Sequence, residues 1–166
     1  MFVMQVPRVL VSFKCAKEFG RTCSCLVVQD CRAIVKASLQ NIESSHSYSV
    51  KHILPTKSKS HHFIDIDLSL DPKGNYHVAR EGDLFLFSHY SPQQEGFEYG
   101  YRSFGIASNI SRHSKFHQGF EAQTPKKFKV FHYATFLTNV TAFSNAWNAV
   151  NLDNSESNCA RVISIM

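Results

Sequence analysis

The sequence carries little charge and lacks several short motifs that mark enzymes. Only 19% of its 166 residues are Asp, Glu, Lys or Arg, less than a typical soluble domain carries. None of its seven glycines precedes Lys-Ser or Lys-Thr, and no GxGxxG occurs, so the chain is not a complete P-loop ATPase. HExxH and GxSxG are also absent, which argues against the common zinc and serine hydrolases. We therefore expect no catalytic residue, no metal and no cofactor.

The sequence also lacks the spacings of a zinc site and the apolar run of a membrane span. Its five cysteines form no CxxC pair, so we predict reduced intracellular thiols. The N-terminal run MFVMQVPRVLVSF is interrupted by Arg8, and about 20 continuous apolar residues are needed to cross a bilayer. We predict neither a signal peptide nor a membrane span, and a nuclear or cytoplasmic location.

What the chain does contain is enough apolar material for one core. Its hydrophobic fraction is 43% and it has 14 phenylalanines, which excludes wholesale disorder. At this length one compact domain is expected rather than two. Alternating apolar residues predict strands over residues 62–70, 84–87, 101–110 and 126–136.

Helices are predicted on either side of these strands. Apolar residues at spacings of three and four predict a helix from Val27 to about Ile42, and a similar pattern follows a helix start at Asn139 or Thr141. The Ser-rich residues 44–47 are expected to end the first helix, and residues 55–60 and 111–125 are interpreted as a polar connector and a basic loop. The predicted fold class is mainly β (α+β), a small antiparallel barrel or curled sheet with a helix before it and a helix after it. Residues 1–26 are predicted to be a poorly ordered leader, 27–150 the domain, and 151–166 a tail.

Charge is distributed unevenly along the chain, whose net charge is +5. Among the charged residues of 61–99, Asp and Glu outnumber Lys and Arg. Residues 100–132 instead hold six Lys or Arg residues and one acidic residue, Glu121. These cations are the candidate nucleic-acid-binding residues: Arg102, Arg112, Lys115, Lys126, Lys127 and Lys129. The simpler interpretation is a solvated basic loop and strand edge.

Aromatic residues near this basic block are candidates for stacking on bases, although most phenylalanines must belong to the core. They are Tyr99, Tyr101, Phe104, Phe116 and Phe120.

Three segments resemble a region of the plant senataxin-like (MAGATAMA-type) superfamily-one helicases. They are Gly82-Asp-Leu-Phe-Leu-Phe87, Arg102-Ser-Phe-Gly-Ile-Ala-Ser108, and Phe136-Leu-Thr-Asn-Val-Thr141 continued by Ala146-Trp-Asn-Ala-Val150. In those helicases a GDIF strand, a W-x-x-AS strand and an FLTNITTNKRIWNAL junction occur in this order, ahead of the ATP-binding core. The helix around residues 32–39 is similar as well, so the resemblance covers roughly residues 27–150.

The resemblance implies an uncharacterised β-barrel domain that lies N-terminal to the helicase ATPase and helps guide single-stranded nucleic acid. Two departures limit what is carried over. The basic NKR of the family's junction is Phe143-Ser144-Asn145 here, and the chain ends before any Walker A sequence, so ATP hydrolysis is not expected.

Three functions remain open on the sequence. The first is a non-enzymatic accessory domain that binds RNA or single-stranded DNA weakly through the six cations. The second is a protein-interaction module that docks on a RecA-like helicase core through an apolar helix face. The third is an unrecognised hydrolase, which would require a convergent His/Cys/Asp cluster. No membrane partner and no small-molecule substrate are expected.

Overall fold

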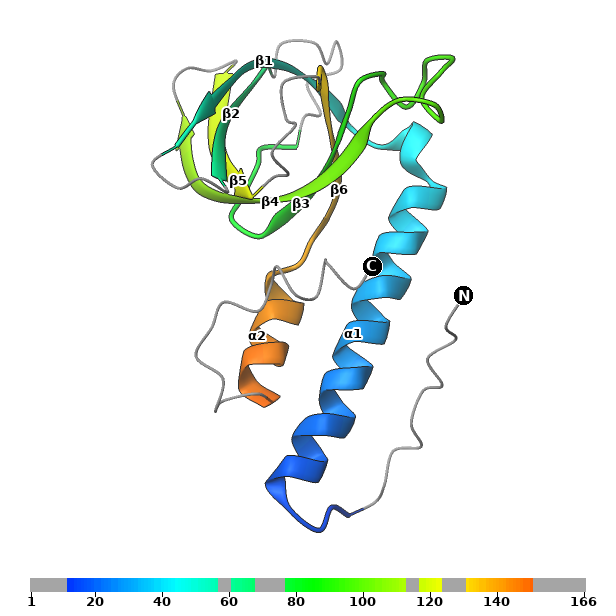
Figure 1. Cartoon of the computed structure of the whole chain (residues 1–166), viewed down its shortest axis with the longest axis vertical. Coiled ribbons are helices and arrows are strands. Elements are labelled where there is room, and N and C mark those ends of the chain that lie inside the picture. The colour runs from blue at the N-terminus through cyan, green and yellow to red at the C-terminus, as the bar shows by residue number, and fades with distance from the viewer. Residues whose placement is uncertain (1–11, 57–60, 68–76, 113–116, 124–130, 151–166) are drawn as a thin grey trace. The chain divides into compact units, whose positions relative to one another are not determined.

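A computed structural model describes residues 12–56, 61–67, 77–112, 117–123 and 131–150. Within these residues the elements are α1 (Ala16–Gln40), η1 (Ile42–Ser44), β1 (Ser47–Pro55), β2 (His61–Asp67), β3 (Asp83–Ser88), β4 (Arg102–Arg112), β5 (His117–Gln123), β6 (Tyr133–Asn139) and α2 (Thr141–Val150). The strands curl into a barrel, and the helices precede and follow it in the chain (Figure 1).

The barrel is closed, in the order β1-β2-β5-β4-β3-β6. Every neighbouring pair is antiparallel, including β1 with β6, which closes the ring. Closure satisfies the backbone groups that an open sheet would leave at its edges. The predicted fold class, a small antiparallel barrel with one helix before it and one after it, is confirmed.

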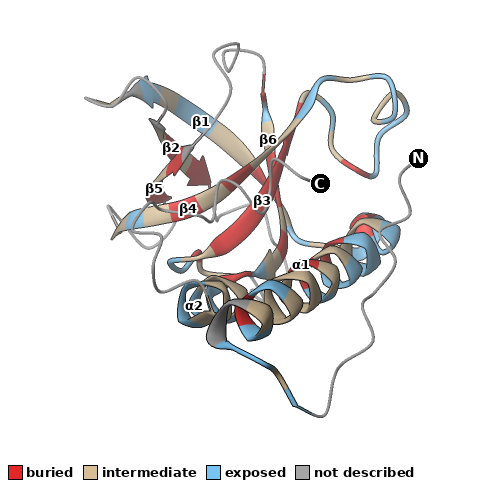
Figure 2. Ribbon diagram, turned by 60° about the horizontal axis from the view of Figure 1, so that its bottom comes forward, coloured by how far each residue is buried: buried red, intermediate tan, exposed pale blue. Residues whose placement is uncertain are grey.

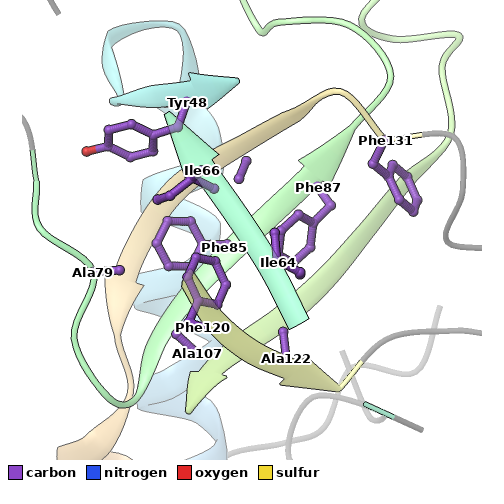
Figure 3. Close-up of a cluster of buried hydrophobic side chains, with 11 residues drawn as sticks. Tyr48, Ile64, Ile66, Ala79, Phe85, Phe87, Ala107, Phe120, Ala122 and Phe131 are labelled. Atoms are coloured by element: carbon purple, nitrogen blue, oxygen red, sulfur yellow. The ribbon is translucent and has the colours of Figure 1, made fainter. Parts of the chain in front are cut away.

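The interior of the barrel is filled by side chains. Phe85 and Phe87 of β3 are fully buried, and Phe85 stacks on Phe120 with ring centroids 4.9 Å apart. The cluster draws on all six strands and on the segments just before β3 and β6, as Figure 3 illustrates. Its members are Tyr48, Ile64, Ile66, Ala79, Phe85, Phe87, Ala107, Phe120, Ala122, Phe131 and Ala134. A dry aromatic core of this kind supplies most of the stability of a small barrel.

The predicted strands at 62–70, 84–87 and 101–110 correspond to β2, β3 and β4. The alternation in β2 is confirmed where it is described, because Ile64 and Ile66 are fully buried. All six residues of β3 are buried, which Figure 2 shows as a continuous red ribbon. Of the strand predicted at 126–136, residues 126–130 lie outside the described residues, and β6 runs from Tyr133 to Asn139.

The sequence prediction contains neither β1 nor β5, because it has no strand between the first helix and the connector at 55–60 and treats residues 111–125 as a loop. In β1, the pairing with β2 shifts between Val50 and His52, so the core-facing positions are Tyr48, Val50 and Ile53 rather than a strict alternation. In β5, the second missed strand, Gln118 is buried beside Phe120. Because glutamine is polar, the inward-facing positions of this strand do not form the alternating apolar pattern that predicts a strand. Both strands are needed to close the barrel.

The residue contacts divide the chain into two units, residues 1–36 with 140–166, and residues 37–139. In the first unit, α1 begins at Ala16 rather than at Val27, so residues 16–26 of the predicted leader are helical. Val28, Cys31 and Val35 are buried, as the predicted apolar face requires. A Cβ atom on Gly20 would lie 2.7 Å from the Val150 carbonyl oxygen, which means that α1 and α2 approach closely there.

Candidate functional site

Of the six residues in the predicted basic block, Arg102 is the one whose side chain the structure describes. Arg102, the first residue of β4, is exposed, and its guanidinium lies 5.3 Å from the centre of the Phe97 ring. Its Nη2 donates to the Glu98 carbonyl oxygen at 3.4 Å. Arg112 is the last residue of β4, but its side chain is not described. The other four candidates, Lys115, Lys126, Lys127 and Lys129, lie outside the described residues.

The aromatic candidates separate into surface and core. Tyr99 and Tyr101 are 91% and 75% exposed, so both rings are available to a partner. Phe120 is fully buried in the barrel, and its assignment as a stacking residue is wrong for that reason. Phe104 is partly buried, and Phe116 lies outside the described residues.

A hollow of about 650 Å³ lies beside Tyr99 and Arg102. One wall is the end of α1 with η1, and the other is the loop that joins β3 to β4, which lies next to that end of the helix in Figure 1. All of its lining belongs to the unit 37–139. The lining residues are Leu39, Gln40, Ile42, Glu43, Pro92, Gln94, Glu95, Gly96, Phe97, Glu98, Tyr99 and Arg102. Its size falls in the range of ordinary ligand-binding pockets.

The β3–β4 loop has a defined conformation. Gln93 Nε2 donates to the Glu43 carbonyl oxygen at 2.8 Å, which ties the loop to η1. Gly96 has φ +93°, a value that favours glycine, and accepts from the Tyr99 N–H at 3.0 Å. A Cβ atom on Gly100 would lie 2.9 Å from the Tyr90 ring, so glycine allows the loop to pack on that ring. The hollow is therefore shaped before any partner arrives.

A second polar cluster lies at the start of β3. The Asp83 carboxylate is fully buried, and Nε2 of His77 lies 2.6 Å from its Oδ2. The Arg80 N–H also donates to Oδ2 at 2.6 Å, and Asn139 Nδ2 donates to Oδ1 at 2.8 Å. The His77 ring stacks on Phe136, with centroids 3.7 Å apart.

This cluster resembles the Asp-His half of a hydrolase triad, but its contacts are those of a structural clamp. Three donors converge on Asp83, two from the segment before β3 and one from the end of β6, and they fasten these two parts of the chain together. Gln118 fastens the same segment from inside, since its amide donates to the Ala79 carbonyl at 2.7 Å and accepts from the Ala79 N–H at 2.8 Å.

Asp67 of β2 has a structural partner as well. Asp67 is buried, and Lys51 Nζ lies 3.0 Å from its carboxylate. Strict alternation with Ile64 and Ile66 would place Asp67 on the water-facing side of β2, and its burial is an exception to that pattern. Among the residues described, no group of three or more His, Cys, Asp or Glu side chains is arranged to hold a metal ion.

The described cysteines, Cys15, Cys23, Cys25 and Cys31, form no disulfide bond. Within the described part of the chain, neither helix has the length and apolar character that a membrane span requires.

Comparison with protein-family models and with curated proteins found no match for this chain. The proposals below therefore depend on the residues themselves and on the sequence resemblance described above.

The hollow is the feature that sequence reasoning missed. Two of its acidic residues, Glu95 and Glu98, belong to the acid-rich stretch 61–99, and two tyrosines follow them, so part of the signal was present. The position of Glu43 opposite the loop could not be found in the sequence, because it depends on how η1 turns the chain into β1.

Proposed function

We propose that this chain is a non-catalytic accessory β-barrel domain of the plant senataxin-like helicase type, acting in the nucleus or the cytoplasm. The observation that carries the proposal is the position of the segments that resemble those helicases. They are β4, β3 and β6, which are neighbours in the barrel and form one continuous wall of it. In proteins that share a fold, strands that pair with one another are expected to be similar together. The pairing of these three segments therefore supports the resemblance.

The proposed activity is weak binding of RNA or single-stranded DNA through the six cations of the basic block. Each phosphate contact should contribute about −0.7 to the slope of log affinity against log salt for single strands. The test is a fluorescence-anisotropy titration with a labelled oligonucleotide at low and high salt. We expect Lys126→Ala/Lys127→Ala/Lys129→Ala to weaken binding and flatten this slope, whereas Arg80→Ala removes a charge outside the block and serves as the control. No binding of the wild-type chain at low salt would rule out this activity.

A second candidate function is a protein-interaction module that docks on a RecA-like helicase core. The hollow favours it, because exposed tyrosines beside a shaped depression are typical of protein interfaces. The test is co-purification with a helicase ATPase core before and after nuclease treatment. Retention after nuclease supports direct docking, and loss shows that nucleic acid bridges the two.

A further inference from the structure

We propose that the hollow between η1 and the β3–β4 loop binds an arginine-bearing peptide segment of a protein partner. This inference rests on the second candidate function, because it assigns the surface and the chemistry of the docking. The proposed docking surface is this hollow, whereas the sequence suggested the apolar face of a helix.

Charge is the first argument. Among its described lining residues the hollow has three carboxylates, Glu43, Glu95 and Glu98, and all three residues are exposed. Its one cation, Arg102, is already held by the Phe97 ring and the Glu98 carbonyl oxygen. The lining is therefore net acidic although the whole chain is net basic at +5. A cationic side chain is attracted here, and a phosphate backbone is repelled.

Aromatic groups are the second argument. Tyr99 lines the hollow with 91% of its surface exposed, and Tyr101 stands two residues further on at 75%. A guanidinium stacks on tyrosine rings better than an ammonium does. Arg102 over Phe97 shows that this surface already accommodates a guanidinium against a ring. The combination of carboxylates and open rings therefore favours arginine over lysine.

Preorganisation is the third argument. The loop is tied to η1 by Gln93 and closed on itself by the Tyr99–Gly96 hydrogen bond, so its carboxylates and rings are positioned before binding. Binding a partner then costs less conformational entropy than it would if the loop were flexible and had to become ordered. A volume of about 650 Å³ suits a few side chains of an extended segment, not a whole domain.

The test uses the full chain and fluorescein-labelled tetra-arginine, with tetra-lysine and tetra-glutamate as comparison peptides. In low salt we expect tetra-arginine to bind more tightly than tetra-lysine, and tetra-glutamate not to bind. Glu95→Gln/Glu98→Gln and Tyr99→Ala should each raise the Kd by about fivefold or more, the equivalent of about 1 kcal/mol. Asp30→Asn, an exposed charge change on α1, is the matched control and should leave the Kd unchanged. Unfolding midpoints equal to wild type will show that the variants remain folded.

Equal affinity of the wild-type chain and both hollow variants would overturn the proposal, as would equal binding of tetra-glutamate. The same variants also separate this inference from the functions above. If they keep full retention on a helicase core, docking stands and this hollow is not its site. If Tyr99→Ala abolishes oligonucleotide binding instead of peptide binding, the hollow belongs to nucleic acid, and the inference is wrong.

Discussion

Asp83 fastens one end of the barrel through three hydrogen bonds. Its buried carboxylate accepts from His77, from the Arg80 N–H and from Asn139. Asp83→Ala would leave these donors without an acceptor, and we expect the free energy of unfolding to fall by about 2–5 kcal/mol. Asp83→Asn keeps the shape and one acceptor oxygen, so its loss should be smaller. Urea unfolding of both variants gives the comparison, and equal losses would contradict the clamp.

Gly119 of β5 makes room for an aromatic ring of the neighbouring strand. A Cβ atom there would lie 2.0 Å from Cζ of Phe63 in β2. We expect Gly119→Ala to lower the free energy of unfolding by about 1–3 kcal/mol, because the ring must move. In a Phe63→Ala background the same substitution should cost much less, giving a coupling of about 0.5–3 kcal/mol in a double-mutant cycle. An equal cost in both backgrounds would mean that the ring is not the obstacle.

At the scale of elements, the two helices of the first unit are joined by a close approach at Gly20. Glycine in a helix normally costs about 1 kcal/mol relative to alanine, so Gly20→Ala should stabilise α1 taken alone. Here the new methyl group would lie 2.7 Å from the Val150 carbonyl oxygen. We therefore expect Gly20→Ala to displace α2 and to shift the emission of Trp147, the one tryptophan of the chain, to longer wavelength.

The control for this prediction is Ala33→Gly, at an exposed position of α1. It weakens the helix by about 1 kcal/mol through propensity alone, and the Trp147 emission should stay where it is. A Gly20→Ala protein that is more stable than wild type, with unchanged emission, would show that α2 does not depend on this approach.

Helices and strands were predicted correctly where the apolar residues of their core-facing side follow a regular spacing. β3 is apolar on both faces and α2 keeps helical spacing, with Phe143, Ala146 and Trp147 all partly buried, so both were found. β1 was missed because its bulge breaks the alternation, and β5 because a satisfied Gln118 occupies an inner position. The spacing of apolar residues along one segment cannot show that a buried polar side chain will form hydrogen bonds with a residue elsewhere in the barrel.

At the scale of the molecule, the fold class could be predicted but the hollow could not. The four predicted short strands with turns between them indicated a small antiparallel barrel or a curled sheet, and the two further strands β1 and β5 close the barrel. The hollow joins Glu43 to Glu95 and Glu98, which lie about fifty residues away in the chain. Such a grouping exists only after closure of the barrel has set the loop beside η1. Four of the six predicted basic residues are not described, so the basic block stays a prediction.

The division of contacts predicts that residues 37–139 fold without the rest of the chain. The buried cluster of the barrel comes entirely from positions 48 to 134, and the clamp on Asp83 uses residues up to Asn139. We expect this fragment to keep a β-type circular-dichroism spectrum and a cooperative thermal transition, because small single domains usually unfold in one step.

A fragment carrying Phe85→Ala tests whether that transition reports the barrel. Phe85 is fully buried and contacts the Phe87, Phe120 and Phe136 rings, so its truncation should cost about 3–5 kcal/mol and abolish the transition or lower its midpoint steeply. The hollow also lies inside the fragment, so the fragment should bind tetra-arginine as the full chain does. A fragment that melts without cooperativity would show that the helices of the first unit are required for the barrel to fold.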